Sequence, residues 1–377
     1  MVYLDSAATT LQKPASVVEA VRKSMLTCAS PGRGGYQAAE RAARTVFECR
    51  ERAANLLGAQ DMEKVVFTLN ATHALNIAIK SLVSPGGKVV VSGFEHNAVM
   101  RPLTAIGGVD IRVVKSRPFE STECLQGFEK TVTRDTSAVI CTHVSNVFGC
   151  VQPIEDIAEI CRSLDVPLIV DASQSAGALR VDADGWGAAF VAMPGHKGLY
   201  GPQGTGILVC GHEAKTLIEG GTGSMSAMME MPDFLPDRLE AGTHNVPGIA
   251  GLGAGIAFIE NRTAERIAAH ERALVLRAAN KLRSMPRVRV FASENGENQA
   301  GVLSFSLRGT DCESVAQKLS ERNIAVRAGL HCAPLAHITA GTDATGTVRI
   351  SASAFTQIDE IDYFLSVMRE ISSGKAG

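Results

Sequence analysis

Short apolar, β-branched runs alternate with longer amphipathic stretches through about the first 250 residues of the chain. Short runs of this kind predict strands, and apolar residues spaced three and four positions apart predict helices. The predicted strands are Lys64–Leu69, Lys88–Ser92, Ile111–Val114, Ala138–Thr142, Leu168–Val170, Ala188–Met193 and Gly206–Val209. Two helices are clear: Arg41–Leu57, which stops before a glycine, and Pro153–Leu164, which starts at a proline. The alternation predicts an α/β fold with a mostly parallel, mixed sheet.

The pattern changes after residue 255. We expect one long helix over Ile256–Met285, followed by a strand, a helix, two strands and a last helix. These shorter elements are predicted at Gly301–Leu307, Asp311–Arg322, Ile324–Val326 and Thr347–Ser351, and the last helix is expected to open with the capping pair Thr356 and Asp359. The chain therefore divides into a large domain (15–255), a smaller α+β domain (256–377) and an N-terminal segment (1–14) that we expect to pack on the small domain.

Composition narrows the class of protein. Of 377 residues, 45% are hydrophobic and 20% are charged, and the net charge is −2. These values fit a globular chain with a large core, and they argue against nucleic acid or an anionic membrane as a partner. No apolar run is long enough to span a bilayer, and the first residues do not resemble a secretion signal. Nine cysteines without a regular framework indicate a reducing, cytoplasmic location and no structural metal site.

Lys197 lies in a glycine-rich turn, Met193-Pro194-Gly195-His196-Lys197-Gly198, directly after an apolar strand. Glycine neighbours leave room for the lysine amine to approach a planar cofactor closely. Most lysines beside glycines are solvated, so the turn alone settles nothing. Asp171 ends the strand that begins at Leu168, and open α/β sheets bind ligands at such ends. Its carboxylate could pair with a pyridinium nitrogen, or it could cap the next helix.

Two further strand ends carry suitable groups. His96 follows Lys88–Ser92 and could stack on a ring, although a histidine there is more often a surface or capping residue. Thr72 and the free amides near His73 open a helix, where phosphate binds readily, but an ordinary helix cap has the same sequence. The four groups follow four separate strands, and each suits a different part of pyridoxal phosphate. Together they predict an enzyme that uses this cofactor.

The chain also resembles the class V aminotransferase superfamily, and within it the cysteine desulfurases, especially the type II (SufS-like) group. The resemblance runs from Tyr3-Leu4-Asp5-Ser6-Ala7-Ala8-Thr9-Thr10 to the final helix. Its other anchors are Val170-Asp171-Ala172-Ser173-Gln174, Gly195-His196-Lys197, Glu240-Ala241-Gly242-Thr243 and Arg327-Ala328-Gly329-Leu330-His331-Cys332-Ala333. The fold implied is that of fold type I enzymes dependent on pyridoxal 5'-phosphate. In it, Lys197 would bind the cofactor covalently, Asp171 would hold the pyridine nitrogen, Gln174 the ring hydroxyl, and His96 would stack on the ring and relay protons.

The resemblance also assigns the phosphate end of the cofactor. Thr72, the backbone near His73, and His196 would hold the phosphate, and Thr243 would reach in from the other subunit of a homodimer. One position departs from the pattern. Related enzymes usually carry serine or threonine two residues before the histidine of the lysine motif, whereas this chain has Pro194, which offers no donor. We therefore expect weaker retention of the cofactor, or a substitute donor.

Cys332 decides the specific activity. A buried free cysteine is usually inert, but the surrounding glycine, histidine and proline predict an exposed loop here. By resemblance, Arg349 would clamp the carboxylate of L-cysteine and Asn146 would face the cofactor or substrate. Lys197 would remove the α-proton, and the Cys332 thiolate would take the sulfur as a persulfide and release alanine. His331 is a candidate for activating this thiol.

The resemblance further implies a role in sulfur mobilisation for iron–sulfur cluster assembly. The segment between Cys332 and Arg349 is short, as in type II enzymes, which favours a dedicated sulfur-acceptor protein as partner. Alternatives within the superfamily are a selenocysteine lyase and a cysteine sulfinate desulfinase. Outside it, the chain could be a thiol hydrolase that pairs Cys332 with His143 or His331, or a non-catalytic assembly scaffold. The scaffold is disfavoured because competent residues occupy the principal catalytic positions.

Overall fold

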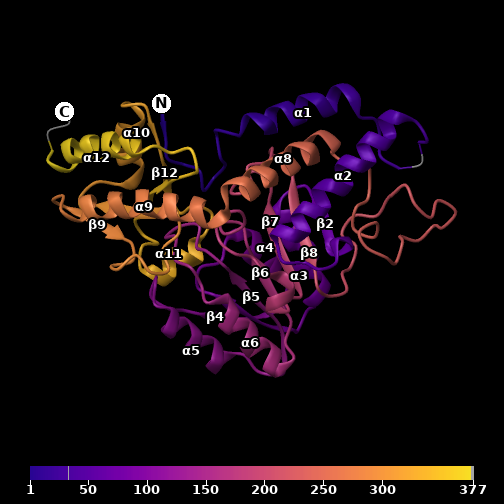
Figure 1. Ribbon diagram of the computed structural model, residues 1–377. Coiled ribbons are helices and arrows are strands. Elements are labelled where there is room, and N and C mark those ends of the chain that lie inside the picture. Colours follow the sequence, from indigo (N-terminus) through magenta and orange to yellow (C-terminus); the bar gives the residue numbers. More distant parts are fainter. Residues whose placement is uncertain (33, 375–377) are drawn as a thin grey trace.

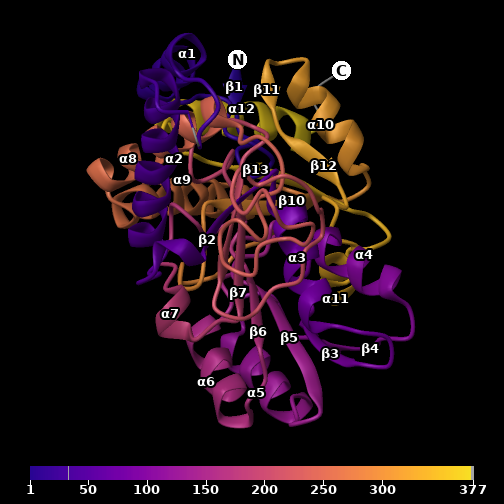
Figure 2. The same cartoon turned by 90° about the vertical axis from the view of Figure 1, so that its right-hand side faces the viewer.

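The computed structural model describes residues 1–32 and 34–374 of the chain. A seven-stranded sheet with the order β2-β8-β7-β6-β5-β3-β4 forms the centre of its larger part (Figures 1 and 2). The strands are β2 (Val65–Thr68), β3 (Lys88–Ser92), β4 (Asp110–Val114), β5 (Thr136–Thr142), β6 (Leu168–Asp171), β7 (Phe190–Pro194) and β8 (Gly206–Cys210). Neighbours from β7 to β4 are parallel, and β8 is antiparallel to both of its neighbours. The predicted α/β class, its mixed sheet and all seven strands are confirmed.

Helices cover both faces of this sheet, because both faces are apolar. Val90 of β3 packs into a core shared with α2, α5, α6 and α8, whereas Val89 and Val91 pack on the other side with α3 and α4. The helices of this part are α1 (Ala15–Thr27), α2 (Gln37–Leu56), α3 (Ala71–Leu82), α4 (Asn97–Ile106), α5 (Ser121–Thr131), α6 (Ile154–Leu164), α7 (Ala183–Trp186) and α8 (Val246–Arg262). The parallel strands therefore end together at one edge of the sheet, which positions the site.

A second, four-stranded antiparallel sheet has the order β12-β13-β10-β9 and its own core. Its strands are β9 (Val288–Phe291), β10 (Val302–Leu307), β12 (Arg327–Gly329) and β13 (Thr347–Ser351), accompanied by α9 (Ala264–Arg283), α10 (Cys312–Ser320), α11 (Pro334–Ala340) and α12 (Ile358–Ser372). The N-terminus lies on this side of the molecule (Figure 1), where β1 (Val2–Tyr3) pairs with β11 (Ile324–Ala325). Leu4 is fully buried in this second core.

The expected single helix Ile256–Met285 is wrong. The structure has two helices, α8 and α9, that meet at Thr263, whose φ of 65° ends the first helix. The Thr263 hydroxyl then caps α9 by accepting from the Arg266 amide at 3.3 Å. Because of this break, α8 belongs with the first core, and α9 passes from the first core at Ile267 to the second at Leu274.

The cap expected for the last helix is also wrong by one position. The capping box of α12 is formed by Gln357 and Glu360. Thr356 is buried, and its hydroxyl accepts from the Ser353 amide at 3.0 Å, so it stabilises the preceding turn instead. Within the described residues, no helix combines the length and apolar character that a membrane span requires.

Candidate active site

One cavity opens at the edge of the large sheet where the parallel strands end. It brings together seven of the predicted site residues: Thr72, His96, Asn146, Asp171, Gln174, His196 and Lys197. The remaining lining residues are Asn70, Ala71, Ala98, Thr142, Ser173 and Pro194. Four predicted residues, His73, Thr243, Cys332 and Arg349, do not line it.

Lys197 reaches this cavity from the tight turn after β7. A Cβ atom on Gly195 would lie 2.1 Å from the Thr205 hydroxyl oxygen, and one on Gly198 would lie 2.3 Å from the Ala176 carbonyl oxygen. Glycine is therefore required at both positions because the turn packs closely against Thr205 and Ala176. The sequence had suggested a different reason, namely room for a cofactor. Burial lowers the pKa of Lys197 to about 8, and the nearby Asp171 carboxylate opposes part of this shift.

Asp171 ends β6 beside this turn and is 3% exposed. Its Oδ1 atom accepts from the Ser173 amide at 2.9 Å, within the turn that follows β6. The next helix, α7, begins only at Ala183, so the capping interpretation is wrong. A buried carboxylate is normally paired with a cation. Among the described residues, none forms a salt bridge with Asp171, although its side chain lines the cavity. This arrangement fits a cationic ligand atom such as a protonated pyridine nitrogen.

His96 is the N-cap of α4, and its Nδ1 atom accepts from the Ala98 amide at 3.0 Å. It is thus both a capping residue and a wall of the cavity. Burial lowers the pKa of His96, and the Lys197 and Arg349 charges lower it further, against the opposing effect of Asp171. The imidazole is therefore neutral, with its proton on Nε2, because Nδ1 is an acceptor.

Gln174 and His196 are both tied to the N-terminal segment. The Gln174 amide group donates to the Ala7 carbonyl oxygen at 3.0 Å, and His196 Nδ1 lies 3.0 Å from the Thr9 hydroxyl. Burial lowers the pKa of His196 to about 4, and the Lys197 charge lowers it further. The first ten residues therefore hold two of the predicted cofactor ligands in place.

The start of α3 forms another wall of the cavity. Asn70 caps this helix, and its Oδ1 atom accepts from the His73 amide at 2.9 Å. Thr72 lies exposed at the cavity, and the His73 amide is already engaged by the cap. A phosphate at this helix start would thus meet Thr72 and share or displace the cap at His73. Pro194 also lines the cavity and brings no donor to it.

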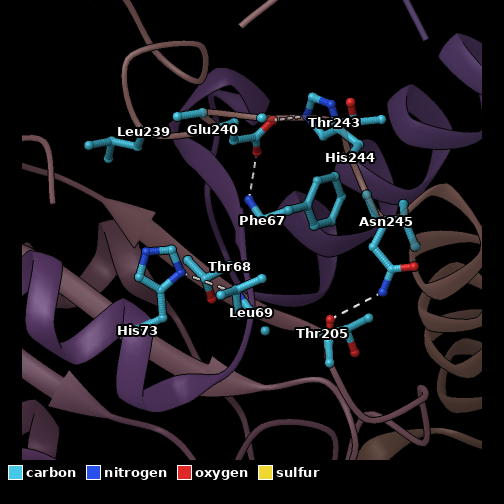
Figure 3. A pocket seen from close by; sticks show the side chains of 15 residues that line it. Phe67, Thr68, Leu69, His73, Thr205, Leu239, Glu240, Thr243, His244 and Asn245 are labelled. Atoms are coloured by element: carbon cyan, nitrogen blue, oxygen red, sulfur yellow. Dashed lines mark hydrogen bonds and ion pairs between the residues drawn. The ribbon is translucent and has the colours of Figure 1, made fainter. Parts of the chain in front are cut away.

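Thr243 lies exposed in a second pocket, and His73 lines the same pocket from its other side (Figure 3). Its segment is anchored by the buried Glu240 carboxylate. The two Glu240 oxygens each accept from Arg50 at 2.8 Å, and Glu240 also contacts the Phe67 amide at 2.6 Å and His244 Nε2 at 2.6 Å. These bonds fix the segment while leaving the Thr243 hydroxyl accessible from outside the chain.

Cys332 is exposed, as expected, on the loop between β12 and α11. Its φ of 56° and the 50° of His331 place two consecutive non-glycine residues in the left-handed region, which is strained. The loop is held by two bonds: Asn146 Nδ2 donates to the His331 carbonyl oxygen at 2.8 Å, and the Asn97 amide donates to the Cys332 carbonyl oxygen at 2.8 Å. Asn146 thus links the cavity wall to the cysteine loop.

The structure does not place His331 as a partner of the thiol. Its ring is buried, and Nε2 lies 3.1 Å from the Thr347 carbonyl oxygen. Burial lowers the pKa of His331 to about 2, so the ring carries no charge. His143 is also buried, and burial lowers its pKa to about 4. In the described part of the chain, no histidine hydrogen-bonds Cys332, which leaves the thiol hydrolase without its base.

Arg349 is 2% exposed and lies behind the cavity wall. Its Nη1 atom donates to the Asn146 carbonyl oxygen at 2.9 Å, and its Nη2 atom donates to Asp5 Oδ1 at 2.8 Å. Asp5 is shared with Arg327, whose Nη2 atom lies 2.9 Å from Asp5 Oδ2. The predicted carboxylate clamp is therefore part of a buried charge cluster.

Asp5, Arg327 and Glu95 are polar groups of the site to which the sequence pattern assigned no chemistry. Glu95 is fully buried, and burial raises its pKa to about 8. It contacts Ser92 and accepts from the Thr142 amide at 2.7 Å. Only its place three residues after the end of an apolar strand signalled a role. Asp5 and Arg327 lie in motifs that carried the resemblance, but nothing in the sequence joined them.

Comparisons with known proteins find relatives along nearly the whole chain. The family model described as aminotransferase class-V matches residues 2–364. A probable cysteine desulfurase from Methanothermobacter thermautotrophicus is 35% identical, over 98% of this chain and 94% of the relative. A probable cysteine desulfurase from Mycolicibacterium paratuberculosis is 33% identical over the whole chain, which spans 56% of that longer relative. The apo structure of cysteine desulfurase from Thermococcus onnurineus is 31% identical over 99% of this chain and 95% of that one, with a TM-score of 0.91.

Proposed function

The chain belongs to the aminotransferase class-V family, and from this premise we propose that it is a pyridoxal-phosphate-dependent cysteine desulfurase. One observation carries the proposal: Lys197 and Asp171 share a cavity whose wall, through Asn146, is hydrogen-bonded to the exposed Cys332 loop. A cofactor aldehyde needs the amine, its ring nitrogen needs the unpaired carboxylate, and sulfur removal needs the thiol.

The chain's own residues would hold the cofactor from several sides. Lys197 would bind it covalently, Asp171 would pair with its ring nitrogen, Gln174 with its hydroxyl, and His96 would stack on its ring; all four line the cavity. Thr72, the amides near His73, and His196 would receive the phosphate, with Thr243 supplied by a second copy of the chain. When bound, the ring withdraws electrons from the α-carbon of the substrate.

The same residues would then move the proton and the sulfur. Asn146 in the cavity wall and the buried Nε of Arg349 directly behind it, unpartnered within the described chain, would orient the carboxylate of L-cysteine. Lys197 Nζ would take the α-proton in its uncharged form, which a pKa of about 8 makes accessible. The Cys332 thiolate attacks the substrate sulfur: the new S–S bond forms as the Cβ–S bond breaks. The carbon fragment would keep the electron pair, gain a proton at Cβ, regain the α-proton from Lys197 and leave as alanine, with the persulfide on Cys332.

We further propose the type II arrangement, a homodimer and a sulfur-acceptor protein that takes the persulfide. A compact helix, α11, forms half of the short segment between Cys332 and β13, and Cys332 is accessible from outside. The segment between β8 and α8 extends away from the body (Figure 1) and exposes Met225, Met228, Met229 and Phe234. Such an apolar surface, next to the exposed Thr243, favours burial against a second copy.

The deciding experiment measures alanine release from cysteine and persulfide on Cys332 by mass spectrometry, for the parent and for Cys332→Ala. We expect the variant to lose at least about 100-fold in desulfuration while keeping its cofactor absorbance, because the thiol is the sulfur acceptor. Cys312→Ala, which removes a buried thiol, is the control. If Cys332→Ala still releases alanine from selenocysteine or cysteine sulfinate but the parent shows no preference for cysteine, the enzyme is a lyase or desulfinase instead.

A further inference from the structure

Arg327 and Arg349 lie directly opposite one another on the antiparallel strands β12 and β13. Like charges at such positions repel, and burial of Arg349 makes the repulsion stronger. Asp5 is inserted between them. Its Oδ1 atom accepts from Arg349 Nη2 at 2.8 Å, and its Oδ2 atom accepts from Arg327 Nε at 3.0 Å and Nη2 at 2.9 Å.

Asp5 is delivered to this position by the backbone. Pairing of β1 with β11 sets the register of the N-terminal segment, and Asp5 itself forms a parallel bridge with Ser351. Its carboxylate is enclosed, since Asp5 is 8% exposed. The cluster therefore has a fixed composition of two guanidinium groups and one carboxylate, and its formal charge is +1.

This charge lies next to the substrate cavity. Arg349 Nη1 donates to the carbonyl oxygen of Asn146, and Asn146 lines the cavity. The buried Arg349 Nε atom has no partner among the described residues, so the guanidinium keeps a donor for one more acceptor. After the larger effects of burial and Asp171, the charges of Arg349 and Arg327 lower the pKa of Lys197 and the charge of Asp5 raises it, so the cluster lies within electrostatic range of the amine.

We propose that Asp5 is a specificity-determining residue that sets the charge of the substrate's carboxylate site. With a net charge of +1, the cluster matches an amino acid with one carboxylate and a neutral side chain, such as cysteine. Without Asp5 the charge would be +2, and a second anionic group on the substrate would be favoured, as in cysteine sulfinate. This inference rests on the proposed function, because it concerns the choice of substrate at the same site.

A double-mutant cycle that changes the charge of the cluster tests this role of Asp5 in the cofactor-loaded enzyme. We would compare kcat/KM for alanine release from cysteine and cysteine sulfinate in the parent, Asp5→Asn, Arg327→Gln and the double variant. Asparagine keeps an acceptor for the arginines but removes the charge. We expect Asp5→Asn to raise the sulfinate-to-cysteine ratio about tenfold or more, Arg327→Gln to lower it, and the double variant, again at +1, to return it to near the parent value.

Two further measurements distinguish a failure of the role of Asp5 from a failure of the proposed function. Asp362→Asn breaks an exposed ion pair with Arg277 and should leave the ratio unchanged. The thermal unfolding midpoint of each variant, measured in malonate and in acetate, reports the charge of the site without turnover. Because malonate carries two carboxylates and acetate one, malonate should stabilise Asp5→Asn more than it stabilises the parent. The role of Asp5 would be overturned if folded Asp5→Asn kept both the parent's sulfinate-to-cysteine ratio and the parent's response to malonate. It would also be overturned if the double variant did not return to the parent's ratio. If the parent releases alanine from neither substrate, the proposed function fails, while the malonate comparison still decides the charge.

Discussion

Lys197 and Lys13 are both enclosed near the site, and burial lowers the pKa of each amine to about 8. Lys13 donates to the His196 carbonyl oxygen at 2.9 Å. By contrast, no described oxygen accepts a hydrogen bond from Lys197 Nζ. An enclosed charge without an acceptor destabilises the chain by itself, and bonding to a cofactor would remove that cost.

This difference gives a prediction at the scale of one residue. At pH 7 the amine is charged in both states, so the folded chain carries the full desolvation cost. Between pH 8 and 10.5 only the folded amine has lost its proton, and the cost disappears as pH rises. We expect cofactor-free Lys197→Met to exceed the parent in free energy of unfolding by about 3 kcal/mol or less at pH 7, and by progressively less toward pH 10.

Urea unfolding of cofactor-free protein at pH 7 and at pH 9.5 measures this difference. Lys281→Met, at an exposed position of α9, serves as the control and should show no such dependence. A stabilisation that stays constant between the two pH values would mean that packing of the methionine, and not loss of a buried charge, is responsible.

At the scale of elements, the buried pair Arg50–Glu240 ties the segment before α8 to α2 and β2. Removing one partner leaves the other charged and unpaired inside the protein. We therefore expect Arg50→Met to lower the free energy of unfolding by about 3–5 kcal/mol, measured by urea denaturation. The same change at the exposed pair Arg277–Asp362 should cost about 1 kcal/mol or less. Equal effects at the two sites would contradict a structural role for the Glu240 network.

The ends of strands and helices show which elements the local hydrophobic pattern of the sequence could locate. Strands such as β3 were located from apolar runs because burial on both faces leaves a continuous signal. The break at Thr263 was missed because apolar periodicity continues through it, and only the two cores on either side require the helix to change direction. The predicted cap of α12 was wrong by one residue because Thr356 and Gln357 are both polar. They differ in burial, which the sequence does not show: Thr356 is buried, and Gln357 caps the helix.

At the scale of the whole molecule, an exposed Thr243 predicts a site completed by two chains. Lys197→Ala removes the amine that would bind the cofactor, and Thr243→Val removes the hydroxyl that would contact its phosphate. In a mixed dimer, the site with Lys197 would receive Thr243 from the other chain and be intact. Unfolding and refolding the two inactive variants together should therefore restore about a quarter of the parent activity, as random pairing of a symmetric dimer predicts. Each variant refolded alone is the control, and no recovery in the mixture would mean that Thr243 acts within its own chain.

The sequence by itself determined the fold class, the seven strands of the large sheet and the identity of most groups in the cavity. It could do so because Lys197, Asp171, His96 and Thr72 each follow a strand, and parallel strands end at one edge of a sheet. It also identified Cys332 as exposed, from the composition of its loop.

Only the tertiary structure decided how the remaining groups are connected. Asp5 meets Arg327 and Arg349 although more than 300 residues separate them along the chain, because β1 pairs with β11 and β12 with β13. Asn146 likewise joins the cavity to the cysteine loop through a single hydrogen bond. Such contacts leave no periodic trace in the sequence, since each depends on the register of strands from different parts of the fold. Local patterns specify elements, whereas the charge and coupling of the site follow from how those elements pack.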